Sequence, residues 1–212
     1  MSAPLIAKRW RRPALWAAVV TAAGVLALAV AVAGGRSTSF DTWVFVHAYR
    51  HIGNGGALTL LSFSTPAIAV SICAFVAVGS ALVRRWDLAA LAVLGPTITV
   101  LVTEDVLKPI VDRALVVGTF QVRGVFPSGH EAAVASTVCV LVIVAGQFQL
   151  RRRARVAFFS LLALWVVVAA LGLIRNLWHY ATDTIGSMLL SVTVVSLLAI
   201  EIDDHGAAVV QR

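Results

Sequence analysis

Three short clusters of polar and ionisable residues interrupt a chain that is otherwise strongly apolar. They are EDVLKPIVDR (104–113), PSGH (127–130) and RNLWHYATD (175–183). Each cluster lies at the end of a long uncharged run, where a membrane helix would meet the headgroups. Ionisable residues at membrane depth are costly, so by default they mark function.

The second cluster has the features of an anion site. Ser128 and Gly129 precede an apolar segment that we expect to be helical, so free backbone N–H groups and the positive end of the helix dipole face outward there. Gly129 allows close approach of the backbone, and Ser128 adds a hydroxyl donor. His130 then stands beside the bound anion. We assign Glu131 no role beyond complementing the helix dipole.

The other two clusters supply what a phosphate site needs. Lys108 and Arg113 are cationic, and a guanidinium has the fork geometry that grips phosphate oxygens. His179 and Asp183 are four residues apart, so they share a helical face if the last helix begins early. A carboxylate bonded to one ring nitrogen leaves the other nitrogen as a nucleophile. Two histidines, one a nucleophile and one a proton donor, form a complete set for phosphoryl transfer without a metal ion.

The composition identifies the elements that must position these clusters. Of the 212 residues, 60% are hydrophobic and only 13% are charged, with a mean hydropathy of +0.93. This excludes an ordinary soluble domain and indicates an integral membrane protein. Six apolar runs approach the length of about 20 residues needed to cross a bilayer. We predict an all-α fold, a polytopic six-transmembrane-helix bundle in one domain, with helices at about 14–34, 57–83, 88–107, 131–150, 156–174 and 182–200.

The basic residues predict the orientation. Eleven lie in the segments on the side of the two termini, and six lie on the other side. By the positive-inside rule, both termini are cytoplasmic and all three polar clusters are extracytoplasmic. The net charge of +7 reflects this topology and attraction to anionic headgroups; basic residues scattered at helix ends do not indicate nucleic acid.

Some features have more than one interpretation. The first apolar run resembles a signal peptide, but its length favours a retained membrane anchor. The segment 41–52 mixes aromatic and basic residues and predicts a short interfacial helix. His47 and His51 share its face and could bind a metal ion, although interfacial polar residues are the interpretation we favour. Cys73 and Cys139 lie inside apolar runs and are predicted to be buried, small apolar side chains.

At these motifs the chain resembles the type 2 phosphatidic acid phosphatase (PAP2) family of integral membrane lipid phosphatases. The family pattern is K-x6-R-P, then P-S-G-H, then S-R-x5-H-x3-D. Here the second motif is complete as FPSGH, and the third retains His179 and Asp183. Six helices with the site at their extracytoplasmic ends also fit, so the resemblance covers nearly the whole chain.

The resemblance implies a role for each matching residue. His179 would attack phosphorus and form a phosphohistidine, oriented by Asp183. His130 would protonate the leaving group and later help to activate water. Lys108, Ser128 and Gly129 would hold the phosphoryl oxygens, with no metal or other cofactor.

The arginines depart from the family pattern. Counted from Lys108 and His179, the family arginines fall on Leu115 and Leu173. Arg113 and Arg175, and also Arg123, are therefore candidate substitutes as phosphate clamps.

The leading hypothesis is a phosphatase in the plasma membrane that hydrolyses a lipid phosphate or diphosphate at the extracytoplasmic face. Candidate substrates are phosphatidic acid, phosphatidylglycerol phosphate and a polyprenyl phosphate or diphosphate. The alternatives are a lipid phosphotransferase with the same site and a catalytically impaired phosphate-binding membrane protein.

Overall fold

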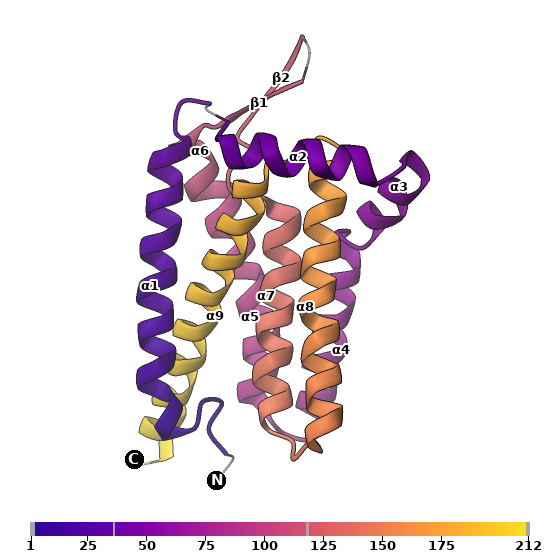
Figure 1. Cartoon of the computed structure of the whole chain (residues 1–212). Helices are drawn as coiled ribbons and strands as arrows, with labels where there is room; N and C mark the ends of the chain where they lie inside the picture. Colours follow the sequence, from indigo (N-terminus) through magenta and orange to yellow (C-terminus); the bar gives the residue numbers. More distant parts are fainter. Residues whose placement is uncertain (1–2, 36, 118, 211–212) are drawn as a thin grey trace.

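Six helices of membrane-spanning length form the body of the protein in the computed structural model, which describes residues 3–35, 37–117 and 119–210. They cover Lys8–Val32, Asn54–Leu82, Trp86–Val111, Gly129–Gly146, Arg152–Arg175 and Ala181–Gly206. Figure 1 shows the long helices side by side, with both chain ends at one end of the bundle. The predicted all-α, polytopic membrane fold is confirmed.

The first and last long helices pack against each other. α1 (Lys8–Val32) runs along α9 (Ala181–Val210). The hydroxyls of Thr21 and Thr193 are 2.7 Å apart at this interface. α1 is therefore a packed member of the bundle.

Two of the spans are interrupted helices. The second consists of α3 (Asn54–Ser62) and α4 (Pro66–Leu82), because Pro66 begins α4 rather than kinking one long helix. The third consists of α5 (Trp86–Leu101), a π-helical segment η1 (Val102–Leu107) and α6 (Lys108–Val111). The remaining spans are α7 (Gly129–Gly146) and α8 (Arg152–Arg175).

A short helix lies across one end of the bundle (Figure 1). α2 (Ser39–His51) begins with a capping box in which the Thr38 side chain accepts from the Asp41 N–H and the Asp41 side chain accepts from the Thr38 N–H. This pairing fixes the start of the helix and turns the Asp41 carboxylate inward, where it is buried.

The chain between α6 and α7 forms a β-hairpin, which the sequence analysis did not predict. β1 (Ala114–Val117) pairs antiparallel with β2 (Phe120–Arg123), with Ala114 opposite Arg123. The Val125 N–H donates to the Arg113 carbonyl just below the strands. The hairpin therefore brings Arg113 and Val125, twelve positions apart in sequence, side by side.

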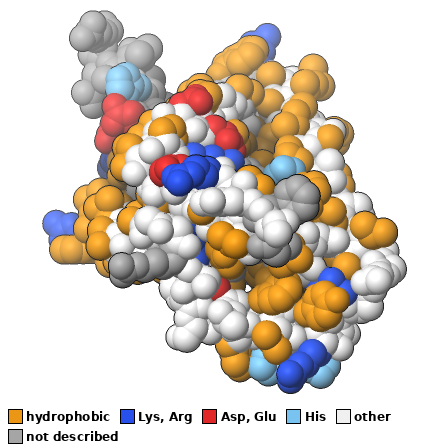
Figure 2. Space-filling view, turned by 90° about the horizontal axis from the view of Figure 1, so that it is seen from above, with side chains coloured by type: hydrophobic (Ala, Val, Ile, Leu, Met, Phe, Trp, Pro, Cys, Tyr) orange, Lys and Arg blue, Asp and Glu red, His pale blue; other side chains and the backbone are white. Residues whose placement is uncertain are grey.

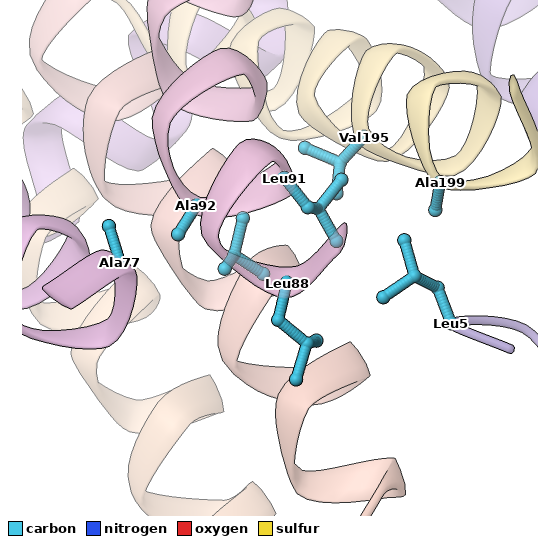
Figure 3. Packing of buried hydrophobic residues seen from close by; sticks show 8 residues of the cluster. Leu5, Ala77, Leu88, Leu91, Ala92, Val195 and Ala199 are labelled. Carbon is cyan, nitrogen blue, oxygen red and sulfur yellow. The ribbon is translucent and has the colours of Figure 1, made fainter. Parts of the chain in front are cut away.

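An apolar cluster closes the opposite end of the bundle. Figure 3 shows Leu88 and Leu91 of α5 packed with Val195 and Ala199 of α9 and with Leu5 from the N-terminal segment. The N–H groups of Leu5 and of the next residue donate to the Asp203 carboxylate. The two chain ends are thus tied to each other.

Small residues let neighbouring segments approach closely near the clusters. A Cβ on Gly172 would lie 2.6–2.7 Å from the backbone of Leu60 and Leu61, so α8 and α3 pack backbone to backbone. A Cβ on Gly186 would lie 2.6 Å from the ring of Phe126, which is fully buried just before the PSGH turn. These contacts fix the position of the turn against α9.

Candidate active site

The PSGH turn forms the start of α7 and is held rigidly. Ser128 is the N-cap residue, and its Oγ accepts from the Glu131 N–H at 3.3 Å. The Ser128 N–H donates to the Asp183 carbonyl at 3.3 Å, and the Ser187 hydroxyl donates to the Ser128 carbonyl at 2.7 Å. Ser128 is fully buried. In this structure its hydroxyl oxygen caps the helix, and its predicted role as a donor to an anion stays a prediction.

The free donors of this turn are backbone groups. Among the described residues, the hydrogen bonds include none from the N–H of Gly129 or of His130. These are the first two residues of a helix of 18 residues. Their N–H groups and the helix dipole give this end the features of an anion site.

Lys108 lies beside this helix start, as expected for a phosphate-binding cation. Its Nζ would be 3.8 Å from a Cβ placed on Gly129. The same Nζ is 2.8 Å from both carboxylate oxygens of Glu104, one turn earlier. A Cβ on Gly129 would lie only 2.0 Å from a Glu104 oxygen. Glu104 therefore covers Gly129 and neutralises the lysine.

His130 lines a pocket. Its ring lies edge-on to Trp178 with centroids 5.4 Å apart. The pocket, of about 350 Å³, is lined by residues of α3, the start of α4 and the two rings: Leu58, Leu61, Ser62, Ser64, Thr65, Pro66, His130 and Trp178. Its wall is mainly apolar, with His130 at one side.

His179 is buried, with one ring nitrogen engaged. Its Nδ1 is 3.0 Å from the Val125 carbonyl oxygen, so Nδ1 carries the proton and Nε2 is the free nitrogen. Asp183 Oδ2 is 3.7 Å from the same Nδ1, longer than a hydrogen bond. His179 lies in the connection before α9, not on its helical face. Asp183 caps the helix by accepting from the Tyr180 N–H at 2.8 Å.

Arg113 lies behind Asp183. Its Nη1 donates to Asp183 Oδ1 and, at 2.7 Å, to the Thr182 hydroxyl. Its Nη2 donates to Asp41 Oδ2 at 2.7 Å, and its guanidinium stacks 4.3 Å from the centre of the Tyr180 ring. The side chain is fully buried. Arg113 therefore contacts Asp183, the carboxylate that the sequence analysis predicted to be catalytic. The sequence analysis did not anticipate this contact.

The structure does not bring Arg175 or Arg123 to the start of α7. Arg175 donates to the Ile52 carbonyl and to Asn54, and its guanidinium lies over Tyr49. It therefore connects α8 to the junction of α2 and α3. Arg123 is exposed on β2 and pairs with Asp112 at 2.5 Å.

The sequence analysis also considered Glu131, His47 and His51. Glu131 is fully buried, and within the described part of the chain neither of its carboxylate oxygens has a hydrogen-bond partner. His47 Nδ1 is 2.8 Å from the Trp43 carbonyl, and its ring lies 6.4 Å from that of His51. Among the described residues, no group of three or more His, Cys, Asp or Glu could hold a metal ion.

The sequence analysis assigned no role to Asp41, Glu104 or the Val125 carbonyl. The signal for Asp41 is the spacing TSFD, since a threonine followed three residues later by an acid is typical of a helix start. Glu104 is one helical turn before Lys108, a spacing that indicates pairing. A backbone acceptor such as Val125 leaves no signal in the sequence.

Viewed from above, one part of the surface carries acidic and basic side chains together, further basic side chains lie around the rim, and hydrophobic side chains dominate the flanks (Figure 2). The PAP2 superfamily model matches residues 69–204, which include all three clusters. The chain belongs to the PAP2 superfamily.

The fold of this PAP2 protein is also similar to a solved structure. That structure is described as the first transmembrane PAP2 type phosphatidylglycerolphosphate phosphatase from Bacillus subtilis. The match has a TM-score of 0.72 at 17% sequence identity and covers 90% of this chain and 97% of the other. Among curated proteins, none matches the chain.

Proposed function

We propose that this protein is an integral membrane phosphatase that removes phosphate from a lipid through a phosphohistidine on His179. The observation that carries the proposal is the environment of His179. Its Nδ1 is bound by the Val125 carbonyl, so Nε2 holds the lone pair. The start of α7, with unbonded N–H groups and Lys108 beside it, supplies the charge that stabilises a phosphoryl group.

The residues support a two-step reaction. Nε2 of His179 attacks phosphorus, and the bond from phosphorus to the leaving oxygen breaks while His130 donates a proton to that oxygen. In the second step His130 takes a proton from water, which attacks phosphorus and releases inorganic phosphate and free His179. Lys108 and the N–H groups of Gly129 and His130 bind the phosphoryl oxygens in both steps.

The pocket next to His130 fits the leaving portion of a lipid phosphate. Leu58, Leu61 and Pro66 give it apolar walls, and the hydroxyls of Ser62, Ser64 and Thr65 add polar groups. This combination suits the region where a polar headgroup joins an apolar tail. Phosphatidic acid, phosphatidylglycerol phosphate and polyprenyl phosphates or diphosphates share this chemistry. The similarity in fold to a phosphatidylglycerolphosphate phosphatase favours the second of these substrates.

The proposed site faces the outside of the plasma membrane, with both termini in the cytoplasm. The support is the excess of basic residues at the end of the bundle that carries the termini. Headgroups in the outer leaflet would then reach the start of α7 without crossing the bilayer.

The test is phosphate release by the purified protein in detergent with EDTA, over a panel of these lipid phosphates. We expect the wild type to release phosphate and His179→Ala to lose at least a thousandfold in kcat. His205→Ala is the matched control, since this histidine is 76% exposed near the other end of α9. Full activity of His179→Ala refutes the proposal. Vanadate binding without turnover by the wild type would support the impaired phosphate-binding protein instead.

A further inference from the structure

The buried arginine links an interfacial helix to the proposed catalytic centre. Arg113 donates to Asp183 of α9 through one terminal nitrogen and to Asp41 of α2 through the other. All three side chains are fully buried. Removing one member of a buried ion pair leaves an uncompensated charge, so these three side chains depend on one another.

Asp41 is bonded at both oxygens. Oδ1 accepts from the N–H and the hydroxyl of Thr182 at 2.8 and 2.9 Å. Oδ2 accepts from Arg113 and from the Thr38 N–H and hydroxyl at 2.7, 3.0 and 2.9 Å. Burial alone would raise the pKa of Asp41, but the N–H groups of Thr38 and Thr182, with Arg113, hold that pKa below its ordinary value. The carboxylate is therefore ionised at neutral pH.

We propose that Asp41 is a positioning residue for the reaction. Through Arg113 it fixes the carboxylate of Asp183, and through Thr182 it fixes the backbone next to Asp183; Asp183 in turn faces Nδ1 of His179. The inference rests on the function proposed above. Among the described residues, the hydrogen bonds of the Asp41 carboxylate go to Thr38, Thr182 and Arg113, so its effect on the substrate is indirect.

The charges explain why an acid is needed at position 41. Arg113 lies between two carboxylates, so Asp41 takes up part of its positive charge. Without Asp41, more of the guanidinium charge would act on Asp183 and weaken that carboxylate as the partner of His179. Because Asp41 and Thr182 are 141 residues apart in the chain, the contact also ties α2 to the beginning of α9.

The experiment compares Asp41→Asn with wild type in kcat, KM and the pH profile of kcat/KM on a lipid phosphate. We expect kcat per folded protein to fall 10- to 100-fold, the effect typical of lost supporting contacts, with KM within twofold. Asp183 lies beside His179, Arg113 pairs with both Asp183 and Asp41, and Lys108 and Glu104 pair beside the helix start that carries His130. Because Asp41→Asn removes one of the two carboxylates that face Arg113, more positive charge acts on His179 and the acid limb of the profile moves to lower pH.

Asp112→Asn is the matched control. It removes an acid that is next to Arg113 in the chain but belongs to an exposed ion pair with Arg123. Asparagine also tolerates the left-handed backbone of residue 112 (φ 42°). We expect wild-type kinetics. If Asp41→Asn does not fold, Asp41→Glu is compared by kcat per folded protein alone, because glutamate displaces the carboxylate but keeps its charge and so leaves the pH profile unshifted.

Two outcomes overturn the inference. One is a kcat in the folded Asp41 variant that equals that of the wild type. The other is a loss of activity that is fully explained by the loss of folded protein, with no shift in the pH profile. If the wild type itself releases no phosphate, the proposed function fails; if the wild type is active and the variant equally so, only the inference fails.

Discussion

At the residue scale, the two histidines are held in different ways. His179 is buried, with Nδ1 bound to a backbone carbonyl and close to a carboxylate. His130 is only partly buried, and its ring lies edge-on to Trp178. The first arrangement suits a nucleophile that must stay in one orientation. The second suits an acid that must follow the leaving oxygen.

His130→Asn tests this division of roles. We expect kcat on an alkyl lipid phosphate to fall by about 10²–10⁴, the usual contribution of a general acid. On an aryl phosphate the loss should be much smaller, because a phenolate leaves without a proton. The measurement is the ratio of the two rates. His47→Asn, on the exposed face of α2, should leave the ratio unchanged. Equal losses on both substrates would contradict the assignment.

The buried carboxylate of Asp41 predicts a pH dependence of stability. Because its folded pKa is below its ordinary value, Asp41 stabilises the fold fully above its unfolded pKa of about 3.9. This stabilisation is lost as pH falls through the folded pKa. Asp41→Asn should therefore be less stable than the wild type at pH 7, by about 3–5 kcal/mol in the free energy of unfolding. This gap in stability between the two proteins should narrow below about pH 4.

Melting temperatures of the detergent-solubilised protein between pH 7 and pH 3 measure this gap. Asp112→Asn should melt like the wild type throughout, since its ion pair is exposed. A gap between wild type and Asp41→Asn that is the same at pH 7 and pH 3 would show that the charge of Asp41 is not what stabilises the fold.

At the element scale, local patterns were predictable and long-range pairings were not. The apolar runs and the PSGH helix start follow from nearby residues, so the sequence predicts the anion site at the start of α7. The spacing of His179 and Asp183 predicted that they lie near each other, and they do, at 3.7 Å, but His179 precedes α9 instead of sharing its helical face. The position of Arg113 depends on the β-hairpin that folds residue 113 onto residue 125, and such a turn has no strong local signal here.

The break between α3 and α4 at Pro66 also depends on a contact between distant residues. A proline in an apolar run fits either a kink or a helix start, and the choice depends on whether α3 finds a neighbour. Gly172 provides one, because its missing side chain lets the backbone of α8 meet that of α3. The pocket next to His130 exists because α3 and α4 are separate helices, so the sequence alone could not predict it.

The π-helical segment η1 carries a prediction of its own. It places Glu104 over Gly129 and against Lys108, so an incoming phosphate competes with an internal carboxylate. Glu104→Gln should tighten inhibition by inorganic phosphate or vanadate about two- to fivefold, in keeping with a partly exposed ion pair. The measurement is the inhibition constant of each anion.

Asp105→Asn is the control for this change, because Asp105 is the acidic residue that follows Glu104 in η1 and is also exposed. It should leave inhibition unchanged. Unchanged or weaker inhibition in Glu104→Gln would show that its carboxylate does not compete with the phosphate.

At the scale of the whole molecule, the outside of the bundle is apolar and its two ends differ. Side chains such as Phe75, Val30 and Leu82 are about four-fifths exposed on the flanks, as expected for contact with lipid tails. The end with the termini carries Arg11, paired with Asp204, and Arg85, paired with Asp87. The proposed site lies at the other end.

Cysteine labelling in intact cells tests the proposed orientation. Val116→Cys on β1 should react with a membrane-impermeant maleimide from outside, because Val116 is 56% exposed on the hairpin that projects from the end of the bundle with α2. Arg153→Cys at the start of α8 should react only after lysis. The native cysteines lie inside α4 and α7, so the wild type is the background control. The reverse labelling pattern would contradict an extracytoplasmic site.

The measurement that most directly tests the central claim is the search for phosphate on His179. Wild-type protein is mixed rapidly with a lipid labelled in its phosphate, quenched in alkali, in which phosphohistidine is stable, and digested for mass spectrometry. We predict label on the peptide that contains His179, and none in His179→Ala. Label on another residue, or turnover by the wild type with no labelled protein at any time point, would contradict the account.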